Sequence, residues 1–234
     1  MTHLIRTSLL LATTALLAAC GANAESPAST STATVASADR SAFERPDDHA
    51  IGNPDAAVTV VEYASVSCGA CANWHNTVYP DFKKKYVDTG KVRYVFREFR
   101  AGEPTMADAG FMIALCAPEE KYFENIGLQF KRQAQMFEFA RNGQLREAYI
   151  NLAKSSGLSE DEFTACMANS ELRAEYQDRE QSGLDLGVTG TPAFVINGEL
   201  QRVFTLESME EVILPLLGEE VPTATEATDE EPSE

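Results

Sequence analysis

Two cysteines, Cys68 and Cys71, stand two residues apart where an apolar, β-branched run gives way to a helical pattern. The run at residues 57–64 is apolar on both faces and predicts a buried strand, and residues 69–87 predict a helix. A helix N-terminus presents unpaired N–H groups and a partial positive charge, which stabilise a thiolate there. The spacing therefore predicts a redox site in which Cys71 lies one helical turn behind Cys68.

The same cysteine spacing occurs in half of a zinc site, so a metal site is the alternative. Zinc takes about four ligands in proteins, commonly from a second Cys or His pair at short spacing. The histidines of this chain are His3, His49 and His75, and the sequence holds no second pair of that kind. The pattern therefore favours a redox pair over a metal site.

The first residues predict export. Residues 1–19 have the basic start and short apolar stretch of a signal peptide, and Leu17–Cys20 resembles a bacterial lipobox, in which Cys20 is lipidated. The alternative is the small-residue site Ala22–Ala24, which would leave a chain starting at Glu25. We favour the lipobox because it requires a leucine three residues before the cysteine, and Leu17 stands there. The cysteine count agrees, since lipidating Cys20 leaves an even number, as expected in an oxidising compartment.

Composition divides the rest of the chain into three parts. Residues 20–45 are rich in Ala, Ser and Thr and predict a lipid-anchored flexible linker, whereas residues 46–217 suit one domain. Residues 218–234 carry seven acidic residues and no basic one, which predicts a disordered tail. The formal net charge of −17 argues against a nucleic-acid partner.

The domain is expected to begin with a strand, a helix and a second strand at residues 91–99. Helices follow, with Thr105 and a capping box at Ser159–Glu162 as expected caps. An Asn-Gly pair at 197–198 between apolar runs then predicts a hairpin. The remaining predicted elements are helices at 106–117, 119–137, 143–155 and about 160–181, strands at 193–196 and 201–204, and a last helix from Leu206.

This element order resembles the thioredoxin fold, an α/β fold, with a helical insertion at about residues 102–185. Three segments carry a resemblance to the DsbA-like family of exported thiol–disulfide oxidoreductases: Val61-Glu62-Tyr63, Cys68-Gly69-Ala70-Cys71 and Val188–Gly198. The resemblance covers about residues 47–217. It implies a cysteine pair that serves as its own redox centre, with no prosthetic group and no metal.

The resemblance also implies roles for the pair. Cys68 is expected to be the nucleophile and Cys71 the resolving thiol, with exchange through a mixed disulfide on Cys68. Gly69 and Ala70 between them add no charge and little bulk, and they are candidate modulators. His75, four residues after Cys71, is expected on the same helix face, where we favour a packing or surface histidine over a third modulator.

Glu62 lies six residues before Cys68 in the buried strand, and the resemblance places an acid beneath the pair there. A buried carboxyl can carry the proton of Cys71, whereas the alternative is a solvent-facing Glu on an edge strand. Pro192 resembles the cis-proline of the family, which faces the disulfide, with Thr191 touching the active sulfur. The alternative for Pro192 is a trans turn proline.

Cys116 and Cys166 both fall in the helical block. In an exported protein they are expected to form a structural disulfide, and the alternative is two free buried thiols.

Three functions follow from these residues. The first is a dithiol oxidase in the periplasm that acts on unfolded or partly folded exported proteins and is reset by a membrane redox partner, with the lipid anchor holding it to the membrane. The second is a periplasmic reductase of the same fold. The third is a non-enzymatic copper carrier that binds through Cys68, Cys71 and His75.

Overall fold

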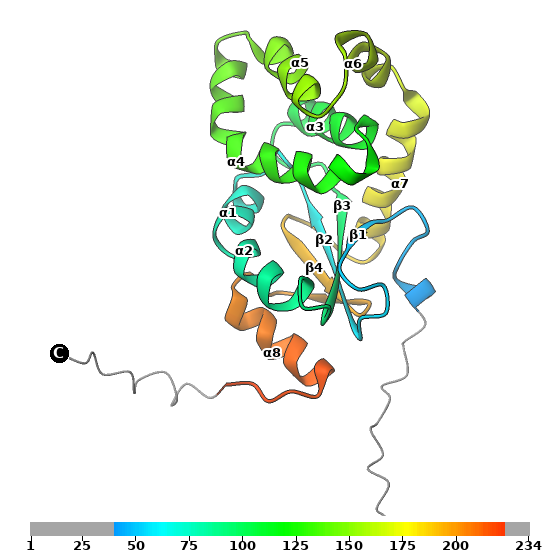
Figure 1. The fold of residues 1–234 in the computed structure, drawn as a ribbon, viewed down its shortest axis with the longest axis vertical. Coiled ribbons are helices and arrows are strands. Elements are labelled where there is room, and N and C mark those ends of the chain that lie inside the picture. Colours follow the sequence, from blue (N-terminus) through cyan, green and yellow to red (C-terminus); the bar gives the residue numbers. More distant parts are fainter. Residues whose placement is uncertain (1–39, 223–234) are drawn as a thin grey trace, which may run out of the picture. The chain divides into compact units, whose positions relative to one another are not determined.

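The structure, a computed structural model, describes residues 40–222 (Figure 1). The predicted signal peptide, Cys20, most of the predicted linker and residues 223–234 of the predicted tail lie outside the described residues. Within residues 40–222 no helix has both the length and the apolar character that a membrane span requires.

A five-stranded mixed sheet forms the centre of the domain, in the order β1-β3-β2-β4-β5. β2 pairs in parallel with β3, and the other neighbouring strands pair antiparallel. Every residue of β2 is buried, as predicted for a central strand. The strands are β1 His49–Ile51, β2 Val58–Ala64, β3 Val92–Glu98, β4 Ala193–Ile196 and β5 Glu199–Gln201.

The helices divide between the two faces of the sheet and a separate block. Figure 1 shows α3 to α6 gathered at one end of the sheet and α8 near the opposite end, as a thioredoxin fold with a helical insertion requires. The helices are α1 Gly69–Thr77, α2 Tyr79–Phe82, α3 Pro104–Cys116, α4 Tyr122–Arg141, α5 Leu145–Ser155, α6 Glu160–Met167, α7 Ser170–Asp185 and α8 Leu206–Leu217. Short 3-10 turns occupy Arg40–Ala42 and Glu119–Lys121.

Both faces of the sheet are covered by apolar side chains. On one face Val60 and Phe194 pack in a large cluster with Trp74 of α1 and Ile213 of α8. On the other face a smaller cluster contains Tyr63. Gly183 of α7 lies so close to that face that a Cβ would sit 2.8 Å from the Tyr63 ring, so only glycine permits this approach.

Two predicted helices are broken in the structure. The helix predicted at 69–87 is α1, α2 and a π-helical segment, Lys83–Val87, because Pro80 in the first turn of α2 has no N–H to continue α1. The helix predicted from 160 to about 181 is α6 and α7. Asn169 caps α7 by accepting the N–H of Leu172, which ends the first helix and starts the second.

A cap, a strand boundary and one strand also differ from the prediction. Thr105 is not a cap: Glu103 accepts the N–H of Met106 at 2.7 Å, and Pro104 begins α3. The second arm of the hairpin is β5, Glu199–Gln201, and so begins directly after the turn rather than at 201. β1 has only three residues and was not predicted. The capping box of Ser159 with Glu162 is confirmed.

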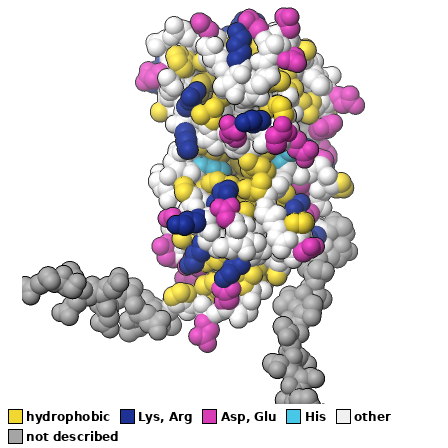
Figure 2. All heavy atoms as spheres, viewed as in Figure 1, with side chains coloured by type: hydrophobic (Ala, Val, Ile, Leu, Met, Phe, Trp, Pro, Cys, Tyr) yellow, Lys and Arg dark blue, Asp and Glu magenta, His cyan; other side chains and the backbone are white. Residues whose placement is uncertain are grey.

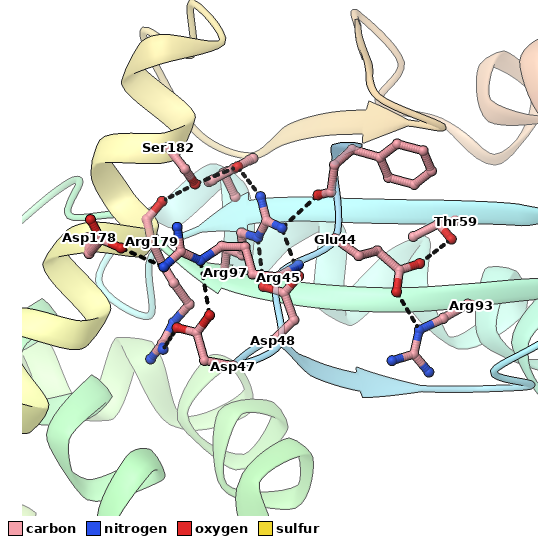
Figure 3. Close-up of polar contacts among 12 residues, drawn as sticks. Glu44, Arg45, Asp47, Asp48, Thr59, Arg93, Arg97, Asp178, Arg179 and Ser182 are labelled. Carbon is pink, nitrogen blue, oxygen red and sulfur yellow. Dashed lines mark hydrogen bonds and ion pairs between the residues drawn. The ribbon is translucent and has the colours of Figure 1, made fainter. Parts of the chain in front are cut away.

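The last residues of the predicted linker contact the sheet (Figure 3). The carboxylate of Glu44 accepts a bond of 2.5 Å from the Thr59 hydroxyl of β2 and one of 3.0 Å from Nε of Arg93 on β3. The Arg40 guanidinium donates to the carbonyls of Pro54 and Ala56. The packed domain therefore extends to at least residue 40, earlier than the predicted boundary at 45.

The surface carries charges of both signs (Figure 2), and it has a hollow between β1 and the helical block. Figure 2 shows hydrophobic side chains gathered between the helical block and the remainder of the domain. A hollow of 400 Å³ lies there, lined by His49, Ile51, Glu119, Glu120 and Phe123, among others.

Candidate active site

Cys68 lies at the point where β2 ends and α1 begins. It is the N-cap of α1, and its Sγ accepts the N–H of Cys71 at 3.3 Å. The Cys68 thiol also donates to the carbonyl of Thr191 at 3.4 Å. Cys68 is 9% exposed and Cys71 is 0% exposed, and both are free thiols. An incoming sulfur therefore reaches Cys68 first, as the sequence predicts.

The two cysteines have opposite shifts of pKa. The hydrogen bond with the Cys71 thiol lowers the pKa of Cys68 from 9.0 to about 6, against the opposing effect of burial, and the side chain of Thr191 and the backbone N–H groups of Cys71 and Ala70 lower it further. Burial raises the pKa of Cys71 strongly, and its hydrogen bond with Cys68 and the negative charge there raise it further. At neutral pH the pair therefore holds a thiolate on Cys68 and a proton on Cys71.

The Thr191–Pro192 peptide bond is cis, which the sequence predicts over the trans turn. Beside it a groove of 510 Å³ runs between α1 and the β5 end of the sheet, lined by Trp74, Thr191, Pro192, Leu200 and Phe204, among others. Leu200 and Phe204 are 40% and 52% exposed, so the groove has an apolar rim. Its apolar rim and its position beside Thr191 suit an extended chain next to Cys68.

Glu62 is fully buried on β2, so the edge-strand alternative is wrong. Its carboxylate lies 3.0 and 3.2 Å from Nε2 of His75 and accepts the hydroxyl of Tyr94. His75 is itself 9% exposed and therefore buried rather than on the surface. The hydrogen bonds of Glu62 thus run to His75 and Tyr94. Cys71, with which Glu62 is predicted to exchange a proton, lies one turn before His75 on α1.

The helical insertion holds the cysteine loop in place. Nε2 of Gln133, on α4, donates to the carbonyl of Val66 at 2.8 Å and to that of Cys68 at 3.0 Å. On the other side of the loop the Ser67 hydroxyl donates to the carbonyl of Ala101 at 2.7 Å. Sequence reasoning missed Gln133 because 65 residues separate it from Cys68 and no local pattern marks it.

A sequence model described as thioredoxin matches residues 44–214. The chain belongs to the thioredoxin family. The curated relatives include a Rickettsia conorii protein named "Putative protein-disulfide oxidoreductase", 30% identical over 74% of this chain and 62% of its own length. The Rickettsia prowazekii protein of the same name is 29% identical and matched over 63% of its length. The chain thus spans less than two thirds of these relatives.

Solved structures place the chain among DsbA-like members of the thioredoxin family. Wolbachia pipientis α-DsbA1 is 27% identical, covers 75% of this chain and 93% of its own, and superposes with a TM-score of 0.66. Chlamydia trachomatis DsbA, at 19% identity and a TM-score of 0.62, shares the fold over 76% of this chain and 95% of its own. The helical insertion of this chain is therefore a shared feature of the DsbA-like fold.

Cys116 and Cys166 are joined in a disulfide that links α3 to α6, with an S–S distance of 2.06 Å. Their Cα atoms are 6.1 Å apart, within the range that a disulfide spans. The predicted bond is thus present in the structure and belongs to the helical insertion.

Sequence reasoning also missed a set of buried arginines (Figure 3). Arg97 of β3 donates twice to Asp48, at 2.8 and 2.7 Å, and once to the hydroxyl of Tyr63. Arg179 of α7 donates to Glu98 at 2.7 Å and to Asp47 at 2.9 Å. These pairs tie the segment before β1, the sheet and α7 together.

Residues 40–222 contain no group of three or more His, Cys, Asp and Glu side chains arranged to hold a metal ion. Nε2 of His75, the third ligand in the copper-carrier alternative, is bonded to Glu62. The arrangement around the cysteines is suited to proton and thiol chemistry.

Proposed function

We propose that this chain is a thiol–disulfide oxidoreductase that acts as a dithiol oxidase on exported proteins through Cys68 and Cys71. The observation that carries the proposal is the place of Cys68 at the N-terminus of α1, where its Sγ accepts the N–H of the buried Cys71. This position agrees with a pKa of Cys68 lowered to about 6 and a raised pKa of Cys71. A stabilised thiolate favours the reduced form of the pair, so the oxidised form gives up its disulfide readily. The names of the Rickettsia relatives support the same activity.

The exchange takes two steps. A substrate thiolate attacks Cys68 of the oxidised pair, the Cys68–Cys71 bond breaks, and Cys71 leaves with both electrons and takes a proton. A second substrate thiolate then attacks the substrate sulfur of the mixed disulfide and releases Cys68 as a thiolate. The substrate gains a disulfide, the pair gains two electrons, and the low pKa of Cys68 makes it a good leaving group.

The groove beside Pro192 supplies the substrate site in this proposal. The segment before β4 contains Thr191, whose carbonyl faces Cys68, and Pro192, which has no N–H. An extended substrate chain that lies along this segment is held next to Cys68. The apolar rim at Leu200 and Phe204 favours unfolded or partly folded chains, which expose apolar side chains. Gly69 and Ala70 at the start of α1 leave the approach to Cys68 open.

Location and resetting are part of the same proposal. The lipobox at Leu17–Cys20 supports a lipid anchor on Cys20 and a place in the periplasm at a membrane surface. A membrane redox partner would then reoxidise the pair after each cycle. If the anchor exists, the mature protein should fractionate with membranes and Cys20→Ser should release it; a soluble mature chain starting at Glu25 would contradict the anchor.

The reduction potential of the Cys68–Cys71 couple tests the activity. Equilibration in glutathione buffers, followed by alkylation and mass spectrometry, gives the oxidised fraction; the Cys116→Ala/Cys166→Ala variant confirms that the mass change comes from this pair. We expect a potential less negative than about −200 mV, as in oxidases. A value near about −270 mV, typical of thioredoxin, would instead assign the reductase function.

A further inference from the structure

The buried Glu62 has a partner that the predicted mechanism did not include. Nε2 of His75 faces both carboxylate oxygens, at 3.0 and 3.2 Å, and the Glu62 side chain is 0% exposed. The buried carboxylate thus has Nε2 of His75 and the hydroxyl of Tyr94 as its hydrogen-bond partners, and Nε2 is close enough to exchange a proton with either carboxylate oxygen.

The residues around Glu62 and His75 fix the positions of both side chains. The His75 ring stacks on Phe130 of α4 at 4.0 Å between centroids, with Trp74 and Phe96 edge-on to it. The titratable groups that face the pair are Tyr94 of β3, which donates to Glu62, and Tyr79 of α2, whose ring lies 4.8 Å from His75. Burial, then the Glu62 charge, raise the pKa of both tyrosines, so neither gives up its own proton.

The position of the pair relative to the cysteines gives it a role. His75 and Cys71 are four residues apart on α1 and both are buried, so they share the face that packs on β2. We propose that His75 is a positioning residue for the proton of Cys71: it orients Glu62 and shares with it the proton that Cys71 takes up and releases. This inference rests on the proposed exchange function.

The proton balance is as follows in the first step of oxidation. Cys71 leaves Cys68 as a thiolate and takes the proton of the His75–Glu62 pair. The pair is left with a neutral imidazole and a carboxylate that Tyr94 still stabilises, and a proton from solvent restores it. In the reverse direction the pair first gives its proton to solvent, and Cys71 then passes its own proton to the pair as it attacks a mixed disulfide on Cys68.

The reverse direction is convenient to measure. Reduced protein reacts with oxidised glutathione, first at Cys68 and then by attack of Cys71, and the second step does not depend on glutathione concentration. Trp74, the only tryptophan of the chain, lies on α1 and packs in the core, so it provides a fluorescence signal. His75→Phe keeps the stacked ring and removes Nε2, and Glu62→Gln keeps the shape and removes the charge.

We expect each single variant to slow the second step by at least about tenfold at pH 7, as removal of a general base does, with the first step unchanged. The double variant should be no slower than the slower single one, because both changes remove the same shared proton. His49→Phe removes the other described histidine and should leave both steps unchanged. A second step at the wild-type rate in His75→Phe, or single effects that multiply in the double variant, would overturn the proposal.

A measurement on the unaltered protein guards against variants that fail to fold. Nitrogen-15 NMR should show an imidazole N–H of His75 that exchanges slowly with solvent; rapid exchange would also overturn the proposal. A failure of this inference can be distinguished from a failure of the proposed function. A wild-type protein whose Cys68 does not react with oxidised glutathione contradicts the function, whereas an unaffected second step in the variants contradicts only the role of His75.

Discussion

The molecule contains two buried polar networks that differ in the kind of charge they use. Beside the cysteines, Glu62 is paired with the imidazole of His75 and the hydroxyl of Tyr94, neither of which carries a permanent charge. Between the segment before β1, the sheet and α7, the carboxylates are paired with Arg97 and Arg179, which stay charged at every physiological pH.

The difference in residue type matches a difference in task. Burial opposes the charge on Arg97, but the hydrogen bonds with Asp48 outweigh it and raise the pKa of Arg97. A permanent ion pair of this kind fixes the segment before β1 on the sheet and offers no proton to a reaction. The comparison therefore teaches that the arginine network should control stability and the histidine network should control reactivity.

The largest expected effect lies in the reactivity of Cys68. Its pKa of about 6 gives it roughly three orders of magnitude more thiolate at pH 6 than a thiol at 9.0 has. The rate of iodoacetamide alkylation should therefore rise to half its plateau near pH 6, with Cys71 unmodified. A rate that keeps rising to pH 9 would contradict the stabilised thiolate.

The same shift has a consequence for the stability of the reduced protein. The folded pKa of Cys68 lies below the unfolded one, so the stabilisation is fully present above about pH 9 and is lost as pH falls through about 6. Cys68→Ser should remove this part of the pH dependence of unfolding.

The next effect is a loss of stability when the arginine network is broken. The comparison would fail if the same change also altered the reactivity of Cys68. Arg97→Met leaves Asp48, whose side chain is 1% exposed, without the arginine that neutralises its charge. We expect the free energy of unfolding in urea to fall by about 3 kcal/mol or more, with the alkylation profile of Cys68 unchanged. The matched control is Arg45→Met, whose exposed pairs with Asp47 and Asp178 should cost less than about 1 kcal/mol. A shifted alkylation profile in Arg97→Met would show that the two networks are coupled.

The smallest effect should change both stability and the reactivity of Cys68, because Gln133 connects the helical insertion to the cysteine loop. Gln133→Leu leaves the carbonyl of Val66 without its donor, which should cost about 1–3 kcal/mol of stability. The half-point of Cys68 alkylation should also move to higher pH, because the loop that presents Cys68 to the N–H of Cys71 is held less firmly. The exposed Gln135 of the same helix provides a control, and Gln135→Leu should change stability by less than about 0.5 kcal/mol.

Sequence reasoning succeeded where a local pattern carried the information. The cysteine spacing after a β-branched run placed Cys68 at the start of α1, and the Asn-Gly turn placed the hairpin of β4 and β5. It failed where tertiary context decided: β1 is a strand only because it pairs with β3, and three residues carry no periodic signal. The break between α6 and α7 was missed because the helical spacing continues across Asn169.

The sequence by itself determined the redox pair, its helix N-terminus and the burial of Glu62, because each depends on residues close together in the chain. The cis-proline came from the resemblance to the DsbA-like family. Only the tertiary structure decided which groups surround them. His75 became the partner of Glu62 because α1 packs on β2, and Gln133 reached Cys68 because α4 packs on α1. Arg97 and Arg179 found their carboxylates across 49 and 81 residues of chain. Contacts between residues so far apart in the chain follow from how the elements pack, and no local pattern in the sequence encodes them.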